Sequence, residues 1–140
     1  VLQGNFEPIV ARYFHATGCE IKNCDFRSFV GNSKSVGKMS ISYRDHKDNP
    51  RRYMPDFMAI GEQTKIVEVK SVHTLLYRKY YEDNISKFER AAQFSKWAGI
   101  GDFTLALLID PKSGVPEIFR NPTRKTLERL LKRFPEAYKH

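Results

Sequence analysis

The sequence predicts an α/β fold in which a mixed β-sheet is flanked by helices. The first observation is the order of its periodic segments: a helical pattern, several strand patterns, a long helix, a buried strand and a last helix. The second is composition, since 41% of the 140 residues are hydrophobic, and ten Phe and seven Tyr supply bulk for a core. We therefore expect one domain over residues 1–140, either alone or cut from a longer chain.

Three segments show helical periodicity. The first helix is expected to begin at Asn5, with Pro8 in its first turn. The second spans roughly residues 78–98, and Gly99 ends it. The third follows Asn121-Pro122 and places leucines on its inner face.

Strand patterns fill the remaining segments. Residues 20–30 and 39–44 alternate in hydrophobicity, and polar loops rich in Gly, Ser and charge flank them. Residues 53–60 and 66–72 are short apolar runs joined by five turn residues, which predicts a β-hairpin. Residues 103–109 form a continuous apolar run, typical of a buried strand.

Charge and cysteine content narrow the classes of function. Lys and Arg number 24 against 16 acidic residues, and this net charge of +8 favours a polyanionic partner such as nucleic acid. Excess lysine that only aids solubility is the alternative. Cys19 and Cys24 fit neither a disulfide framework nor a zinc pattern, so we expect reduced thiols. No segment is long enough to span a bilayer and no signal peptide is visible, which predicts a cytoplasmic protein with no membrane contact.

Three charged residues stand among apolar neighbours in the predicted hairpin, where unpaired charges are costly. Side chains alternate along a strand, so Glu68 and Lys70 share one face of the second strand. If Ile60 pairs with Ile66 across the turn, Asp56 lies opposite Lys70 and diagonal to Glu68. All three charges then lie on one face of the hairpin.

Two carboxylates and an ammonium group that lie together on one face of a hairpin can hold a divalent cation and orient a water molecule. Mg²⁺ prefers oxygen ligands and keeps several waters, so Asp56, Glu68 and the carbonyl of Val69 form a suitable ligand set. Mn²⁺ can take the same place. The alternative is a cross-strand salt bridge between Asp56 and Lys70, with Glu68 in solvent, which leaves the third charge unexplained.

The segment with Pro55-Asp56, eleven intervening residues and then Glu68-Val69-Lys70 resembles the PD-(D/E)xK nuclease signature. The order of elements is also similar over roughly residues 4–110, and Glu7 matches the first-helix glutamate of many members. Within the superfamily, RRYMPDF followed by IVEVKS looks most like transposon-end-cleaving endonucleases of the TnsA type and phage junction-resolving endonucleases. Many TnsA-type enzymes have Gln where this chain has Glu68.

The resemblance implies a restriction-endonuclease-like fold and a Mg²⁺-dependent DNA endonuclease of a phage or mobile element. It implies that Asp56 and Glu68 ligate Mg²⁺, that Lys70 positions the attacking water, and that Glu7 supports a second metal or a water. For Glu7 the alternative is a helix N-terminal acid stabilised by the helix dipole. A homodimer and a targeting protein are further expectations.

Basic residues are expected to neutralise DNA phosphates around such a site. The candidates are Lys34, Lys38, Lys47, Arg51, Arg52, Arg78, Lys79, Arg124, Lys125, Arg129 and Lys132. For the last helix, an ordinary solvated face is the alternative. No helix-turn-helix, zinc-finger or RNA-recognition signature is visible, so the sequence does not indicate what DNA it would select.

The sequence thus predicts an endonuclease that hydrolyses phosphodiester bonds with metal-activated water. A non-catalytic nucleic-acid-binding module with the same fold and a protein-interaction domain with a basic surface are the alternatives. The intact trio of Asp56, Glu68 and Lys70 favours the enzyme, because binding alone does not need carboxylates facing a phosphate.

Overall fold

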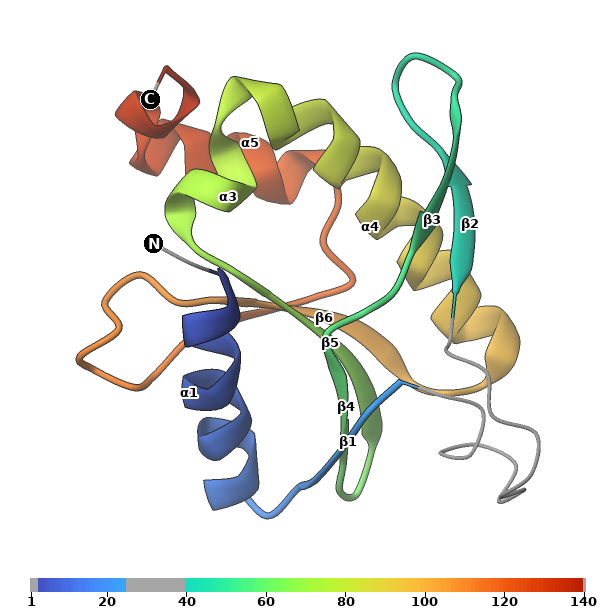
Figure 1. Ribbon diagram of the computed structural model, residues 1–140, viewed down its shortest axis with the longest axis vertical. Coiled ribbons are helices and arrows are strands. Elements are labelled where there is room, and N and C mark those ends of the chain that lie inside the picture. The colour runs from blue at the N-terminus through green and yellow to red at the C-terminus, as the bar shows by residue number, and fades with distance from the viewer. Residues whose placement is uncertain (1–2, 25–39, 140) are drawn as a thin grey trace.

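The computed structural model describes residues 3–24 and 40–139, and the side chains among them from residue 6 onward (Figure 1). Two of the predicted DNA contacts, Lys34 and Lys38, lie outside the described residues, as does most of the basic loop that carries them.

In the described part of the chain, a mixed sheet has the strand order β1-β4-β5-β6-β7. Its strands are β1 (Glu20–Lys22), β4 (Phe57–Ile60), β5 (Thr64–Lys70), β6 (Asp102–Leu107) and β7 (Glu117–Arg120). Strands β5 and β6 run parallel, and the other neighbours in this sheet are antiparallel. A separate two-stranded sheet pairs β2 (Ile41–Arg44) with β3 (Pro50–Tyr53). The predicted class, a mixed sheet flanked by helices, is confirmed.

The helices cover both faces of the sheet, and strands β4 to β6 lie between α1 and α4 in Figure 1. They are α1 (Gln3–Ala16), α3 (Val72–Leu76), α4 (Arg78–Ala98), α5 (Arg124–Arg133) and the 3₁₀ helix η1 (Pro135–Tyr138). Gly99 ends α4 as predicted, in the left-handed conformation with φ 67°. The expected start at Asn5 is wrong, because α1 already begins at Gln3 and Pro8 lies inside it. Helix α3 was not predicted.

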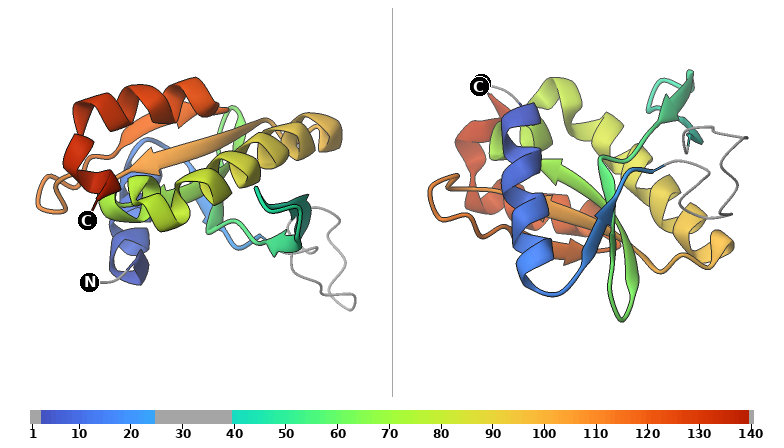
Figure 2. Two further views of the ribbon diagram at one scale, coloured as in Figure 1. Left: turned by 90° about the horizontal axis from the view of Figure 1, so that it is seen from above. Right: turned by 60° about the horizontal axis from the view of Figure 1, so that its bottom comes forward.

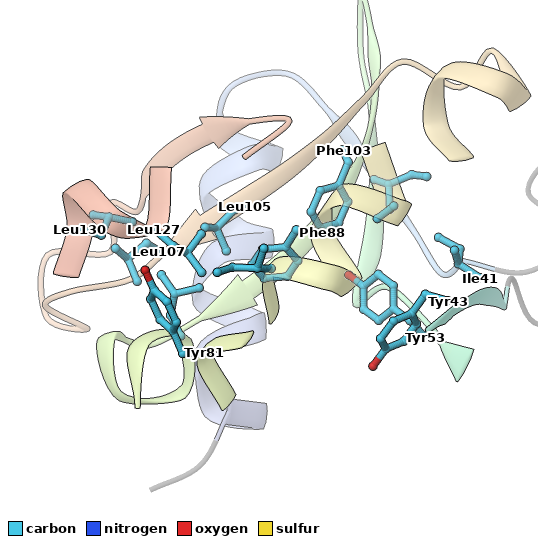
Figure 3. Close-up of a cluster of buried hydrophobic side chains, with 14 of the residues drawn as sticks. Ile41, Tyr43, Tyr53, Tyr81, Phe88, Phe103, Leu105, Leu107, Leu127 and Leu130 are labelled. Atoms are coloured by element: carbon cyan, nitrogen blue, oxygen red, sulfur yellow. The ribbon is translucent and has the colours of Figure 1, made fainter. Parts of the chain in front are cut away.

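The core has two parts, one on each face of the sheet. On the side of α4 and α5, Ile66 packs with Phe88, Phe103 and Leu127 in the cluster drawn in Figure 3. On the side of α1, Val67 and Val69 of β5 are buried in the smaller cluster. Both faces of β5 are therefore covered, which explains why Ile66, Val67 and Val69 are all fully buried.

The expected single strand over residues 53–60 is wrong. Tyr53 ends β3 and pairs with Ile41, whereas Phe57 begins β4 and pairs with Val67. Pro55 lies in the bend between them, where its missing N–H costs no ladder hydrogen bond. The bend lets one continuous stretch of sequence contribute to two different sheets, as the path from the β2–β3 hairpin into β4 shows in Figure 2.

The register of the β4–β5 hairpin also differs from the prediction. Ile60 lies opposite Thr64 and not opposite Ile66, so the turn is two residues shorter than expected. A shift of two residues keeps every side chain on its face. Continuing the ladder by one pair beyond Phe57 places Asp56 opposite Glu68.

Among the described residues, no helix combines the length and apolar character needed to cross a lipid bilayer. Cys19 and Cys24 are buried and are not joined in a disulfide, as expected from the sequence.

Candidate active site

The predicted catalytic residues come together where β5 extends past the start of β4. Glu68 and Lys70 belong to β5, Asp56 lies in the bend before β4, and Glu7 approaches from α1. We call these four residues the carboxylate cluster. Strand β5 and the bend before β4 position Asp56, Glu68 and Lys70. The packing of α1 against β4 and β5 places Glu7 beside them.

Glu68 is held in the interior of this cluster, with 6% of the residue exposed. The hydroxyl of Tyr53 donates a hydrogen bond of 2.8 Å to Oε1, and Nζ of Lys70 lies 3.7 Å from Oε2. Burial, and then the charge of Asp56, raise the pKa of Glu68 to about 7, although Lys70 and Tyr53 act in the opposite direction. The alternative with Glu68 in solvent is wrong, and the ion pair of Lys70 is with Glu68.

Asp56 is anchored to the neighbouring strand by its own side chain. Its backbone N–H donates to the carbonyl of Val67, and its Oδ2 accepts a hydrogen bond of 2.7 Å from the N–H of Val69. Burial raises the pKa of Asp56, while the Val69 N–H and Lys70 act to lower it. In a strand, the N–H and C=O of one residue point the same way, so the carbonyl of Val69 is also directed towards Asp56.

Glu7 stands beside Asp56 and not at the helix end. Because α1 starts at Gln3, its first turn holds no acidic residue, and the helix-dipole alternative for Glu7 is wrong. The side chain is half-buried, and burial followed by the charge and hydrogen bond of Asp56 raises the pKa of Glu7 to about 7. Glu7 and Asp56 are thus two neighbouring carboxyl groups, and the ionisation of one disfavours the ionisation of the other.

A second lysine, missed by the sequence analysis, lies next to the cluster. Lys87 of α4 has its Nζ 5.2 Å from the ring centroid of Tyr53 and 3.9 Å from Oδ2 of Asp83. Burial, and then the charge of Lys70, lower its pKa. The sequence does place Asp83 four residues before Lys87, a spacing that allows an ion pair on a helix. Nothing in the sequence shows that α4 crosses over Tyr53.

The chemistry of the cluster suits Mg²⁺. In the part of the chain that the structure describes, no three His, Cys, Asp or Glu side chains converge into a ready metal cage. Mg²⁺ keeps several waters and is commonly bound by one or two carboxylates, so Asp56 and Glu68 are sufficient in number. The pKa of Glu68 is raised first by burial and then by the charge of Asp56, and a bound cation would offset that second, repulsive effect. Glu7, beside Asp56, is a further carboxyl group that could supply an oxygen ligand.

The predicted DNA-contact residues are scattered over several surfaces. Lys47 lies in the β2–β3 turn, Arg51 and Arg52 belong to β3, and Arg78 and Lys79 are exposed at the start of α4. On α5, the side chains of Lys125, Arg129 and Lys132 are exposed.

Arg124 of α5 is already engaged within the protein. Its guanidinium donates hydrogen bonds of 2.9 and 2.7 Å to the two carboxylate oxygens of Glu82 on α4. Arg133, at the other end of the helix, makes the same kind of contact with Glu117. These two arginines therefore fasten α5 to its neighbours.

No family model, curated protein or solved structure matches the chain.

Proposed function

We propose that this chain is a Mg²⁺-dependent DNA endonuclease of the PD-(D/E)xK type with a restriction-endonuclease-like fold. The observation that carries the proposal is the environment of Glu68, a buried carboxyl group held by Tyr53 and Lys70 and placed opposite Asp56. A structural ion pair would not need a second and a third carboxyl group next to it. The signature spacing in the sequence and the net charge of +8 support the same conclusion.

The proposed reaction is hydrolysis of a phosphodiester bond. Water adds to phosphorus, one P–O bond breaks, and the departing oxygen takes up a proton. Lys70 has its ammonium group at the edge of the cluster, with 14% of the side chain exposed, where it can orient the attacking water. Tyr53 and the Val69 N–H hold Glu68 and Asp56 in fixed orientations. Bound Mg²⁺, or Mn²⁺ in its place, would lower the pKa of a water and offset charge on the phosphate.

The decisive experiment is incubation with supercoiled plasmid and with branched DNA, in Mg²⁺ and in chelator. We expect cleavage in Mg²⁺, none in chelator, and none with the variant Asp56→Asn. Asn keeps an oxygen that can accept from the Val69 N–H, so the variant preserves the local backbone while it removes the charge.

The control is DNA binding by Asp56→Asn in chelator, which should equal or exceed that of the unmodified protein because a negative charge has been removed. Binding of either DNA without cleavage in Mg²⁺ or Mn²⁺ would favour the non-catalytic module instead.

A further inference from the structure

The β2–β3 hairpin forms a hollow lined by arginines at a distance from the carboxylate cluster. It stands beside α4, clear of the main sheet (Figure 1). The hollow has a volume of about 530 Å³, within the usual range of ligand pockets. Its lining contains Arg44, Arg51, Arg52 and Arg90 and no acidic side chain.

Strand pairing explains why arginines gather here. Ser42 lies opposite Arg52, and Arg44 is two residues beyond Ser42, so both arginines occupy one exposed face of the hairpin as diagonal neighbours. Arg90 reaches the same place from α4, where its Nε donates a hydrogen bond of 3.1 Å to the carbonyl of Ser42. Nη1 of Arg44 donates a hydrogen bond of 2.9 Å to the carbonyl of Asp48, and Nη1 of Arg52 donates one of 3.4 Å to the hydroxyl of Ser40. The three arginines therefore line the hollow from separate positions along it.

The positive charge of this hollow is only partly neutralised by the protein. Nε of Arg51 forms an ion pair of 2.9 Å with Oδ2 of Asp45. The pKa of Asp45 is lowered to about 2, mainly by a hydrogen bond from the N–H of Asn49. Arg44 has a looser contact of 3.9 Å with Asp48, a side chain that is 89% exposed. Among residues 6–24 and 40–139, no carboxylate lies within ion-pair distance of Arg52 or Arg90.

We propose that this arginine hollow binds a phosphodiester group of the DNA backbone, a few nucleotides away from the phosphate at the carboxylate cluster. Guanidinium groups match phosphate oxygens in paired hydrogen bonds, which suits a hollow lined by several of them. From Arg52 to Asp56 the chain can span at most about 14 Å between Cα atoms, and a strand of duplex DNA advances about 3.4 Å per nucleotide. The inference rests on the proposed function for its choice of DNA as the ligand.

The test compares two charge-matched variants in chelator, where no cleavage can interfere. Arg44→Gln/Arg52→Gln removes two charges from the hollow, and Lys112→Gln/Lys139→Gln removes two exposed charges elsewhere. Arg51 is left intact because it supports the buried carboxyl group of Asp45. The measurement is the dissociation constant of a labelled DNA duplex at several salt concentrations, with thermal melting as the check on folding.

We expect the slope of log K against log salt to fall by about 1.8 in the hollow variant, from about 0.9 for each lost phosphate contact, and to stay unchanged in the control pair. Equal slopes in both variants would overturn the proposal. Arg90→Lys keeps the charge but removes the paired donors, so it should weaken binding while it leaves the slope nearly unchanged.

A competition separates the DNA backbone from a free phosphate ion. At constant ionic strength, inorganic phosphate should displace the duplex no better than chloride does. Selective displacement by inorganic phosphate would identify a free-phosphate site and refute the backbone assignment. Because all these measurements report binding, a protein that binds through the hollow and never cuts would refute the nuclease proposal alone.

Discussion

The carboxylate cluster and helix α5 both concentrate charge, but the protein treats the two in opposite ways. On α5, Arg124 and Arg133 lie near the surface and each meets a carboxylate in two hydrogen bonds. In the cluster, Lys70 forms an ion pair with only one of the described carboxyl groups, that of Glu68, and the pKa of Glu68 rises to about 7 because of burial and of Asp56. An ion pair at the surface changes the stability of a folded protein little, whereas a buried charge without enough partners lowers it. A cluster of buried carboxyl groups therefore calls for a functional explanation. Charge density alone, as counted in a sequence, does not separate these cases.

The sharpest test of the cluster is Lys70→Met, which keeps most of the side-chain stem and removes the ammonium group. We expect cleavage to slow by about 10²–10⁴-fold if Lys70 orients the attacking water, as for other groups in general acid–base catalysis. The measurement is the rate of plasmid relaxation in Mg²⁺. Lys65→Met, on the same strand but at its other end, is the matched control and should cut normally. Wild-type rates for both variants would remove Lys70 from the mechanism.

The next test removes the hydroxyl group that holds Glu68. Tyr53→Phe leaves a buried carboxyl group without its 2.8 Å hydrogen bond, so we expect the free energy of unfolding to fall by about 1–3 kcal/mol. Denaturant titration measures this loss. Tyr80→Phe, at an exposed position on α4, should change stability little. Equal stability of the two variants would mean that Glu68 finds another donor.

On α5, the three exposed cations distinguish a DNA surface from a solvated face. If Lys125, Arg129 and Lys132 contact phosphates, replacing all three with Gln should lower the salt slope of duplex binding by about 2.7, at about 0.9 for each contact. Binding to different DNA sequences should weaken equally, because backbone contacts carry no sequence information. Glutamine is a good helix former, so the helix is retained. A slope that does not change would assign this face to solvent.

The smallest effect is expected at the balanced pair of α5. Arg124→Gln breaks a bidentate contact with Glu82, but the two side chains are 48% and 40% exposed. Water screens such pairs, so we expect a loss of about 0–1 kcal/mol in unfolding free energy. A double-mutant cycle with Glu82→Gln isolates the interaction. A coupling energy as large as the loss in Tyr53→Phe would show that the two regions do not differ as described.

Much of the fold followed from periodicity. The long helix α4, its end at Gly99, the buried strand β6 and the β4–β5 hairpin were all predicted, because each has a strong local signal in its sequence. Local signals failed where tertiary structure decided. Thr64 and Lys65 were assigned to the turn, yet pairing with Ile60 and Ala59 draws them into β5. Likewise, an apolar run cannot reveal that the chain leaves one sheet and enters another at Pro55.

The site was predicted in part for the same reason. Asp56, Glu68 and Lys70 are close in sequence and on one face in any even register, so a two-residue error did not separate them. Lys87 contacts the site from α4, thirty-one residues beyond Asp56, through a packing contact that no spacing rule contains. Arg44 and Arg90 joined the arginine hollow only once the pairing of β2 with β3 and its contact with α4 were known.

The division of the chain at Pro55 has a consequence for motion. Glu68 and Lys70 belong to β5, a central strand that pairs with β4 over residues 64–67 and with β6 over residues 65–70. Its amide protons should exchange with solvent only when the whole domain unfolds. Tyr53 comes from the two-stranded sheet, whose amides need only local opening to exchange. Such an opening would draw the Tyr53 hydroxyl away from Glu68 while the main sheet stays intact. Of the two side chains that hold Glu68, Lys70 thus belongs to the slowest-exchanging part of the molecule, and Tyr53 belongs to a part that can open by itself.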